Sequence, residues 1–413
     1  MPDPISWYAL GRAVDDPETI LEAVDASILS HNLDPSAHGQ ESEGIYQHRV
    51  APLLDHLNYV IYNNKLNPAA RTVIAICDSG GRGDFRTVQE AIDYANLYGG
   101  GTVHVKAGTY TLTADITLYS NITLEGDDDD TTILDFGDGE RNLRIVGTSG
   151  THKRNITIKN LQITRAAKTD EGAIHISYAD DVQILDCYFT NNNYAASAPN
   201  ADITAEFSCF GIVIERCYFE LSNRCLSFTA QTNVRVQQNT FVGQDSTNEI
   251  IYIGNTVDLV IEDNYFNETL YSTIYTDAAP VHLVIKSNFF YADTSDESGP
   301  VINISGADGV LIEGNTLEGN SIAADAIQLA EGANYCRVIN NYIRNFTGHG
   351  IIVNASDYNI IANNVSRSND YGVRIYGATS DANIVLGNEL RLNSTANLSD
   401  TGTSTVISAN VAP

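Results

Sequence analysis

Hydrophobic and polar positions recur about every 25 residues over roughly the last 260 residues of the chain. Each repeat has two β-branched apolar residues, a polar pair, then Asn or Cys, and often an aromatic residue. The central position is occupied in turn by Leu161, Cys187, Cys217, Asn239, Asn264, Asn288, Asn315, Asn341, Asn364 and Asn388. Three residues earlier stand Ile158, Ile184, Ile214, Val236, Ile261, Ile285, Ile312, Val338, Ile361 and Val385. A short unit recurring at a fixed period predicts a β-solenoid.

Each repeat also contains a second short segment with alternating apolar residues, such as Ile251–Ile253 or Ile302–Ile304. Alternation with a period of two places the Ile and Val side chains inside the coil and the intervening residues outside. Because stacked coils are spaced by about 4.8 Å, like residues lie on like residues. The consecutive Asn residues are therefore predicted to form an internal ladder of amide hydrogen bonds at a turn.

Residues 1–74 show helical periodicity instead of alternation. Asp16 and Pro17 provide a cap and a first-turn proline, and Ile20, Leu21, Val24 and Ile28 then form one apolar stripe. Short helices that are this apolar on one side need a partner surface. We therefore expect residues 1–74 to be a helical segment for attachment or oligomerisation.

The pattern of apolar and polar residues changes again near residue 75. Thr87 and Glu90 form a capping box, which predicts a helix over residues 87–98 that ends at Gly99. An amphipathic helix here would cover the open edge of the first coil, which is otherwise prone to aggregation. The predicted organisation is a solenoid over residues 75–400, followed by a terminal tail at 401–413.

The charge balance narrows the choice of partners. The chain has 52 acidic and 23 basic residues, a formal net charge of −29. Such a surface repels nucleic-acid phosphate, and it opposes polyanionic glycans unless divalent cations bridge the charges. Neutral glycans and proteins are easier partners, and no nucleic acid is expected.

Clustered acidic and histidine residues raise the question of metals. The acidic run Asp127–Asp130 could bind Ca²⁺ through hard oxygen ligands, although a solvated acidic turn is the alternative. His31, Asp34 and His38 could bind a transition metal, but such residues more often cap helices and shape turns. We assign no metal ligand and expect no cofactor, with Ca²⁺ as the one candidate.

The chain has no stretch of eighteen apolar residues, and its start, Met1–Trp7, lacks the basic and apolar regions of an export signal. We therefore expect no membrane insertion and no Sec-type export. Cys187 and Cys217 occupy the column that Asn fills in later repeats. They are expected to be small buried residues and not partners in disulfides.

The segment from Gly81 to Ile92, continuing through Gly108–Tyr110, resembles the opening coil of right-handed parallel β-helix proteins. Pectin methylesterases, pectate-lyase-like enzymes and many phage tailspikes share this fold. The resemblance implies an all-β, right-handed, single-stranded parallel β-helix over roughly residues 75–400. It implies little about chemistry, because one fold hosts many activities.

The catalytic motifs of those families match only in part. Gln244–Thr247 resembles one pectin methylesterase segment, but the second is missing. Gly348–Gly350 and Arg374–Tyr376 resemble two polygalacturonase segments about one coil apart. The upstream pair Asp180–Asp181 lies some seven coils from His349, so the carboxylates that glycoside hydrolysis needs are not where that family has them.

Two rows of outward residues are candidate binding surfaces. The first combines aromatic rings, which suit the apolar face of a sugar, with amides that suit its hydroxyls. Its predicted glycan-binding residues are His175, Tyr252, Tyr275, Asn303 and Gln328, and Ser227, Ile352 and Arg374 lie in the same row. An ordinary solenoid surface or a subunit interface is the alternative.

The second row follows the Asn column and consists of Tyr188, Tyr218, Tyr265, Phe289 and Tyr342. Five exposed aromatic residues in one row exceed what a monomer usually leaves in contact with water. We therefore expect a subunit interface, and by analogy with tailspikes a homotrimer.

A polar cluster is expected near one end of the first row. Asp325, His349, Tyr371 and Arg374 should lie on adjacent coils, where they could act as acid, base and charge stabiliser in glycosidic cleavage. The alternative is ordinary surface polarity, which is common on β-helix faces.

The segments His31–His38 and Ile45–Arg49 resemble short segments of tailed-phage tail-fibre and virion proteins. This implies a virion appendage, assembled in the host cytoplasm, that contacts other tail or capsid proteins and a host-surface polysaccharide. One alternative is an extracellular polysaccharide-degrading lyase or glycoside hydrolase. Another is a purely structural virion spacer.

Overall fold

A computed structural model describes residues 74–78, 80–137, 141–164, 172–190, 201–220, 222, 224–244, 249–269, 272–277, 280–292, 299–320 and 325–411. The chain divides into two compact units, Met1–Arg71 and Thr72–Pro413, and all described residues belong to the second. The predictions for residues 1–73, including the attachment helices and the histidine turn, lie outside the described residues.

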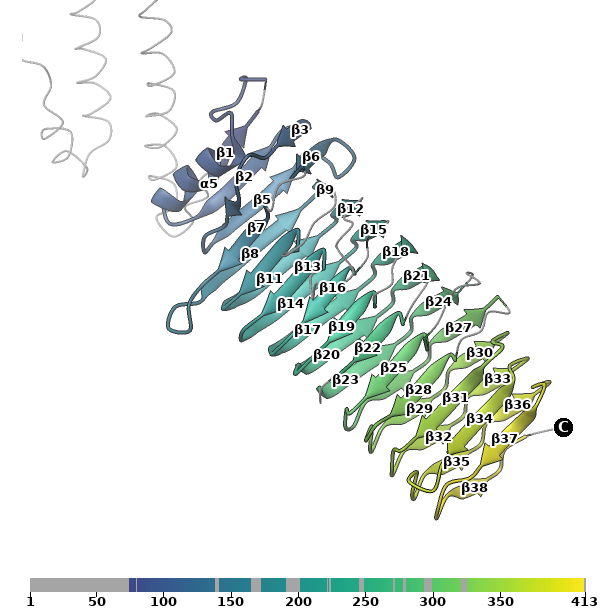
Figure 1. The fold of residues 1–413 in the computed structure, drawn as a ribbon. Helices are drawn as coiled ribbons and strands as arrows, with labels where there is room; N and C mark the ends of the chain where they lie inside the picture. Colours follow the sequence, from purple (N-terminus) through teal and green to yellow (C-terminus); the bar gives the residue numbers. More distant parts are fainter. Residues whose placement is uncertain are drawn as a thin grey trace, which may run out of the picture. The chain divides into compact units, whose positions relative to one another are not determined.

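The second unit is an all-β parallel solenoid of about 12 turns, as the repeat predicts (Figure 1). Its strands form three parallel sheets, here called sheets A, B and C, and each turn passes through A, B and C in that order. Hydrogen bonds run between equivalent strands of successive turns. This arrangement confirms the right-handed parallel β-helix inferred from the opening coil.

Sheet A consists of β1 (Ile74–Cys77), β2 (Gly101–Val105), β5 (Ile122–Gly126), β8 (Lys153–Lys159), β11 (Ala179–Leu185), β14 (Cys209–Glu215), β17 (Gln231–Gln237), β20 (Val257–Glu262), β23 (Val281–Lys286), β26 (Leu311–Glu313), β29 (Arg337–Ile339), β32 (Ile360–Ala362), β35 (Ile384–Leu386) and β38 (Val406–Ser408). Sheet B consists of β3 (Gly108–Thr111), β6 (Thr132–Asp135), β9 (Gln162–Thr164), β12 (Tyr188–Thr190), β15 (Tyr218–Glu220), β18 (Thr240–Gln244), β21 (Tyr265–Thr269), β24 (Phe289–Ala292), β27 (Thr316–Gly319), β30 (Tyr342–Arg344), β33 (Val365–Arg367) and β36 (Glu389–Arg391). Sheet C consists of β4 (Ile116–Thr117), β7 (Leu143–Val146), β10 (Ile174–Ser177), β13 (Ile203–Glu206), β16 (Leu226–Phe228), β19 (Ile251–Ile253), β22 (Ile274–Thr276), β25 (Ile302–Ser305), β28 (Ile327–Ala330), β31 (His349–Asn354), β34 (Tyr371–Tyr376) and β37 (Ala396–Asp400).

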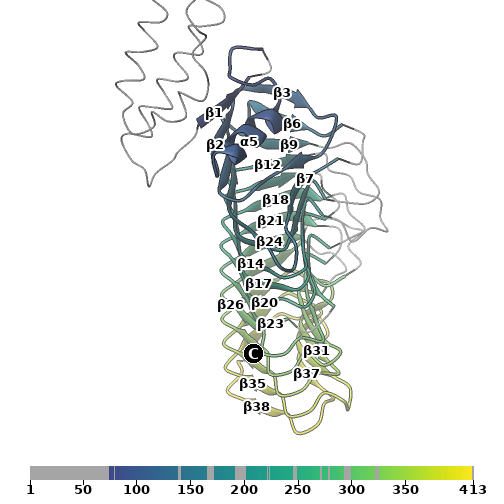
Figure 2. The same cartoon turned by 90° about the vertical axis from the view of Figure 1, so that its left-hand side faces the viewer.

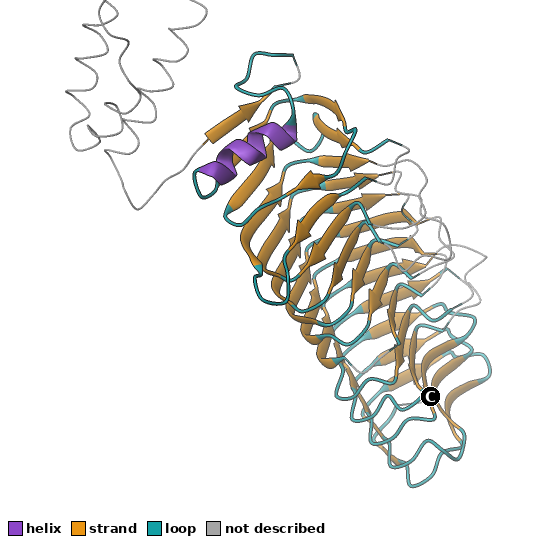
Figure 3. Cartoon of the chain, turned by 60° about the vertical axis from the view of Figure 1, so that its left-hand side comes forward, coloured by secondary structure: helices purple, strands orange, loops and turns teal. Residues whose placement is uncertain are grey.

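The helix α5 (Val88–Leu97) lies across the first turn of the solenoid (Figure 3). Thr87 caps it, because its hydroxyl oxygen accepts a hydrogen bond from the backbone N–H of Glu90 at 3.3 Å. The buried side of the helix, Val88, Ala91, Ile92 and Ala95, joins the hydrophobic core. The helix predicted for residues 87–98 is thus present, and it covers the end of the core as expected.

Asn side chains connect the turns at the corner between sheets A and B. The Nδ2 group of Asn239 donates to Oδ1 of Asn264 at 3.0 Å, and the same contact recurs down to Asn388. The residue before each Asn has a left-handed backbone, as at Asp263 with φ of 55°. This conformation turns the chain sharply into sheet B and points the amide inward. The predicted Asn ladder is confirmed.

Aromatic side chains line the inner side of sheet B. Phe189, Phe219, Phe241, Phe266 and Phe290 stack with centroid distances of 4.6–4.8 Å and interplanar angles of 3–7°. All five are buried, whereas the outward residues of the same strands alternate with them.

The solenoid extends beyond the predicted boundary at residue 400. β38 pairs with β35, and Asn410 continues the ladder by accepting from Nδ2 of Asn388 at 2.9 Å. Residues 401–411 are therefore not a separate tail but complete the last turn (Figure 2). The prediction missed this turn because the apolar repeat weakens there: β38 is exposed.

All six cysteines are free and buried, so Cys187 and Cys217 are core residues as predicted. Among the described residues, no helix is both long and apolar enough to cross a membrane.

Candidate functional site

The outward side chains of sheet C form one continuous row. Strand pairing places His175, Thr204, Ser227, Tyr252, Tyr275, Asn303, Gln328, Ile352 and Arg374 side by side on successive turns. This is the predicted order, with Thr204 added. The whole row spans about 38 Å at the usual strand spacing.

Two features of this row correct the prediction. Ser227 and Ile352, expected on the open face, are buried, with exposed fractions of 3% and 8%. Thr204 is buried as well and lies with Ser227 between His175 and Tyr252. Alternation gives the direction of a side chain but not what covers it. His175 is therefore separated from the tyrosines with which it was grouped.

Tyr252 and Tyr275 form a pair with ring centroids 6.2 Å apart and an interplanar angle of 38°. The Arg224 guanidinium lies over the Tyr252 ring, 5.1 Å from its centroid, and forms an ion pair with Glu249. The Tyr252 hydroxyl donates a hydrogen bond to Asp277. The ring is thus held in one orientation by a cation over one face and by a hydrogen bond at its hydroxyl.

The pKa of Tyr252 lies well above its usual value of 10, because burial and the neighbouring Asp277 carboxylate both disfavour the phenolate. Tyr252 therefore remains a neutral hydrogen-bond donor at physiological pH. A neutral aromatic ring fixed in this way offers a sugar both an apolar face and a polar edge.

Asp325 and His349 form the predicted polar cluster with Arg374. Nδ1 of His349 lies 2.7 Å from Oδ1 of Asp325, which also accepts from the His349 backbone N–H at 2.7 Å. Nη1 of Arg374 lies 2.9 Å from Nε2 of His349. His349 opens β31, and Asp325 occupies the equivalent position one turn earlier, just before β28.

Tyr371 completes the cluster by aromatic contacts. Its ring stacks on His349 with centroids 5.0 Å apart, and the Arg374 guanidinium lies 4.8 Å from its centroid. Tyr376 contacts the same guanidinium at 4.6 Å. All four predicted residues therefore come together, although this proximity does not test a catalytic role.

The hydrogen bonds of the cluster assign the tautomer of His349. Arginine can only donate, so Nε2 of His349 must accept, and the ring proton must reside on Nδ1 and point to Asp325. Both ring nitrogens are thus engaged. To act as a base, Nε2 would first have to lose its contact with Arg374.

The second outward row, on sheet B, is also in the predicted order. Its residues are Gln162, Tyr188, Tyr218, Thr240, Tyr265, Phe289, Thr316 and Tyr342. Only Tyr218 and Tyr265 are exposed, with exposed fractions of 37% and 40%. Tyr188, Phe289 and Tyr342 are half-buried. Five exposed rings were expected, so the free aromatic surface is smaller than predicted.

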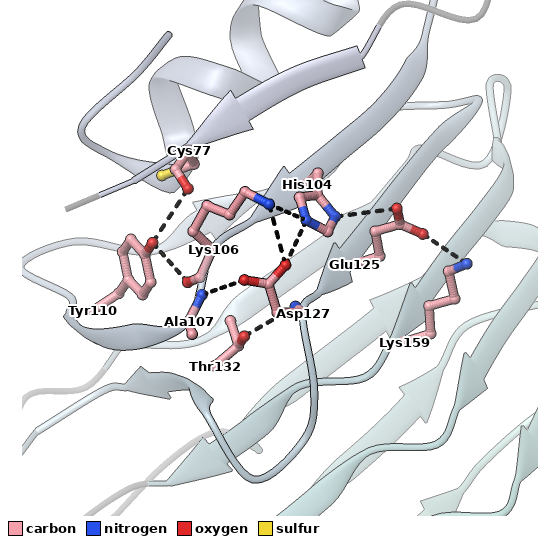
Figure 4. A network of polar contacts seen from close by, with 9 residues as sticks. All are labelled: Cys77, His104, Lys106, Ala107, Tyr110, Glu125, Asp127, Thr132 and Lys159. Atoms are coloured by element: carbon pink, nitrogen blue, oxygen red, sulfur yellow. Dashed lines mark hydrogen bonds and ion pairs between the residues drawn. The ribbon is translucent and has the colours of Figure 1, made fainter. Parts of the chain in front are cut away.

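Asp127, the first residue of the acidic run, belongs to a polar network on sheet A (Figure 4). Its carboxylate lies 2.7 Å from Nε2 of His104 and accepts from the Ala107 N–H at 2.8 Å. Nδ1 of His104 lies 3.2 Å from Glu125, which also pairs with Lys159 at 2.6 Å. Within the described part of the chain, no group of three or more His, Cys, Asp or Glu side chains has an arrangement that could hold a metal ion. Calcium binding at Asp127–Asp130 stays a prediction.

Replacing Asp129 by Asn should stabilise the protein at pH 7. Partial burial and the neighbouring Asp128 raise the pKa of Asp129 to about 6 from its usual 3.8. A carboxyl group with a raised pKa disfavours folding above that value, and the penalty disappears below the unfolded value. We expect the free energy of unfolding to increase by less than about 1 kcal/mol, because solvent screens the site. Urea unfolding at pH 7 and pH 3.5 measures it: the gain should vanish at the lower pH, and an equal gain at both would contradict this origin.

The structure also shows site residues that the sequence analysis missed. Arg224 and Glu249 stand two residues before the first inward apolar residue of their sheet C triplet, the same position that Asp325, His349 and Tyr371 occupy in later turns. The signal was available, because each of these residues stands two positions before an Ile, Leu or Val that opens the repeat triplet. Charged and aromatic side chains therefore occupy this position in two groups, Arg224 with Glu249 and Asp325 with His349 and Tyr371, separated by Ser272 and Pro300 on the two turns between them.

Two sequence families match parts of the chain. Residues 75–273 match the family described as rhamnogalacturonase A/epimerase, pectate lyase-like. Residues 232–411 match the family described as periplasmic copper-binding protein NosD. A search of curated protein sequences finds no match.

Several solved structures share the fold. The tailspike protein 3 of bacteriophage CBA120 is 13% identical with a TM-score of 0.62, over 95% of this chain and 65% of that one. The surface adhesin PfbA of Streptococcus pneumoniae is 15% identical with a TM-score of 0.58, over 78% and 89%. The mannuronan C-5 epimerase AlgE6 A-module of Azotobacter vinelandii is 15% identical with a TM-score of 0.51, over 79% and 94%.

At these identities the similarity establishes the fold alone. The family match over the opening turns and the three continuous parallel sheets agree with each other. The described part of the chain therefore has the parallel β-helix fold, and residues 75–273 are similar to the pectate-lyase-like family.

Proposed function

We propose that this protein is a carbohydrate-binding β-helix of a virion appendage, in which sheet C binds a neutral polysaccharide of the host surface. The observation that carries the proposal is the Tyr252–Tyr275 pair, held by Arg224 and Asp277. Asn303 and Gln328 continue the row with amide groups that suit sugar hydroxyls.

Charge and fold support this choice of ligand and setting. A net charge of −29 disfavours polyanionic polysaccharides and leaves neutral ones as the better ligands. A phage tailspike shares the fold over nearly the whole chain, although this chain spans only 65% of that protein. Residues 1–74 would attach to other tail or capsid proteins. The aromatic row of sheet B would contact sister subunits in a homotrimer.

Polysaccharide cleavage is the second candidate, and the Asp325–His349–Arg374–Tyr371 cluster favours it. In a cleavage reaction, Arg374 would turn to the substrate and free Nε2 of His349 to take a proton, while Asp325 holds the ring. As found, Arg374 occupies Nε2, which is why binding is the better supported function.

Replacing both Tyr252 and Tyr275 by Ala should weaken polysaccharide binding by roughly 10- to 100-fold, since each ring contributes about 1 kcal/mol of stacking. Affinity electrophoresis of the full chain in gels containing neutral glucan, mannan or galactan measures this. Phe210→Ala, which removes an exposed ring from β14 of sheet A, is the matched control and should bind as the unaltered protein does. Equal retardation of all three proteins would refute binding at sheet C.

The same polysaccharides separate the two functions. Release of reducing ends, or of products with a new double bond, that disappears in His349→Ala would establish the enzyme instead. Binding without turnover would exclude it. Co-purification of the protein with virus particles tests the virion assignment independently of any sugar.

A further inference from the structure

From β5 to β38, each turn of the solenoid enters sheet A through one residue with a left-handed backbone. These residues, here called the corner column, have φ between 53° and 72° and are Asn121, Asn155, Asp181, Gly211, Asn233, Asp258, His282, Gly309, Tyr335, Tyr358, Ala382 and Ser404. Pairing within sheet A places them in register on successive turns. Gly, Asn and Asp tolerate this conformation best, and they fill the first half of the column.

Tyr335 and Tyr358 depart from that rule. Bulky side chains are disfavoured with a left-handed backbone, yet these two tyrosines occupy adjacent turns with φ of 56° and 58°. Their rings stack with centroids 5.1 Å apart and an interplanar angle of 5°. They are also 60% and 49% exposed. The core gains little from them, so a strained and exposed aromatic pair indicates contact with another molecule.

Gly309 leaves the neighbouring position of the column empty. A Cβ atom at Gly309 would have no atom within 4 Å, so the space beside Tyr335 is open. His282 is the residue of the column on the other side of Gly309, and its imidazole is hydrogen-bonded to Asp258, on the turn before it, at 2.9 Å. Two turns separate Tyr335 from His282, which corresponds to about 10 Å. A ring stacked at about 5 Å from each would fill that distance.

The polar groups beside the gap are mainly hydrogen-bond acceptors. Asp308, Asn334 and Asp357 each stand one residue before the column, and they are linked along the solenoid by bonds to the backbone. Asp381 continues this line. Such a border repels anions and suits the hydroxyl groups of a neutral sugar, which can donate to carboxylate and amide oxygens.

We propose that Gly309, flanked by Tyr335 and His282 and extended by Tyr358, forms a second carbohydrate site that takes one neutral pyranose ring. The site lies at the entrance to sheet A, where β26, β29 and β32 begin, and is separate from the sheet C row (Figure 1). It rests on the proposed carbohydrate-binding function and adds a second point of attachment, so that a polysaccharide chain or two branches could be held at once.

Replacing Gly309 by Asn tests the site by filling the gap. Asn tolerates a left-handed backbone and meets no atom at this position, so the variant should fold normally. Gly314→Asn is the matched control, because Gly314 has φ of 64° and equally open surroundings at the corner before the Asn ladder. The probes are the methyl glycosides of glucose, galactose and mannose, measured by saturation-transfer NMR on the full chain.

We expect saturation of the ring C–H protons of at least one glycoside by the unaltered protein and by Gly314→Asn. In a Tyr252→Ala/Tyr275→Ala background, which removes the sheet C pair, the signal should fall at least tenfold when Gly309→Asn or Tyr335→Asn is added. Tyr335→Asn should also keep or raise the unfolding temperature, because Asn suits the backbone better. A binding loss without a stability loss separates a functional role of the ring from a structural one.

Three results would overturn the site: no saturation of any of the three glycosides, the same signal with and without Gly309→Asn in the Tyr252→Ala/Tyr275→Ala background, or a change of molecular mass in light scattering for Gly309→Asn. The last would make the column a subunit contact. The proposed sheet C function is tested separately, because it depends on Tyr252 and Tyr275. Polysaccharide binding that persists in Gly309→Asn but is lost in the Tyr252→Ala/Tyr275→Ala variant would support the sheet C site alone.

Discussion

Replacing Asn315 by Leu is expected to destabilise the solenoid by about 3 to 6 kcal/mol. Oδ1 of Asn315 accepts hydrogen bonds from both the backbone N–H and Nδ2 of Asn288, at 3.0 Å each. Its own Nδ2 donates to the Ile285 carbonyl at 2.9 Å and to Asn341 at 3.0 Å. Leu would leave two donors and one acceptor buried without partners, and each such group costs about 1 to 3 kcal/mol.

Urea unfolding followed by circular dichroism measures this loss, with Asn354→Ala as the control. Asn354 ends β31 at a half-buried position outside the ladder and should change stability by less than about 1 kcal/mol. Asn315→Cys should fall between the two, because Cys217 occupies the same column and lies within hydrogen-bonding distance of the Ile184 carbonyl. If Asn315→Leu and Asn354→Ala unfold at the same urea concentration, the ladder does not stabilise the fold.

The ladder was predictable because a parallel β-helix carries sequence position directly into space. Once each Asn stands three residues after an inward Ile or Val, in-register pairing must stack the amides. The same reasoning groups His349, Arg374 and Asp325 from their positions in the repeat alone. Along the solenoid axis, neighbours are set by the repeat, which is visible in the sequence.

Contacts made by residues just outside the repeated strands were harder to predict. The Arg224–Glu249 pair depends on residues just before sheet C, where the connection from sheet B varies in length. Twelve residues separate Thr190 from Ile203, but only five separate Glu220 from Leu226. Because of this variation, the shared position of Arg224 and Glu249 in the repeat can be recognised only once the strands of sheet C are aligned. The burial of Ser227 was missed for a related reason, since periodicity describes direction and not coverage.

The two tyrosines with a left-handed backbone show a second limit of prediction from the sequence. Asn, Asp and Gly favour a left-handed backbone, so their presence predicts such a turn, whereas Tyr335 and Tyr358 give no such indication. Only pairing with Gly309 and Ala382 on the adjacent turns places them in the corner column. Residues that break the local rule at one position of a regular repeat are therefore where a search for function should begin.

Replacing Phe241 by Ala should destabilise the protein by about 4 to 8 kcal/mol. Phe241 is fully buried and stacks between Phe219 at 4.8 Å and Phe266 at 4.6 Å. Truncating a buried Phe costs about 3 to 5 kcal/mol in lost burial and cavity formation, and each lost ring contact adds about 0.5 to 1.5 kcal/mol. The neighbouring turns are fixed by their own hydrogen bonds and cannot close the cavity, so little of this loss is recovered.

Two further variants separate the stack from simple hydrophobicity. Phe241→Leu should cost about 1 to 2 kcal/mol, because Leu317 fills the same column further along the solenoid. Tyr265→Ala removes an aromatic ring from the outward side of sheet B, where Tyr265 is 40% exposed, and should cost less than about 1 kcal/mol. Urea midpoints that coincide for Phe241→Ala and Tyr265→Ala would contradict a stabilising stack. A large loss of stability in Phe241→Ala, with little loss in Tyr265→Ala, would show that the inward rings of sheet B hold the turns together. The outward rings of sheet B would then be available for contacts with other molecules.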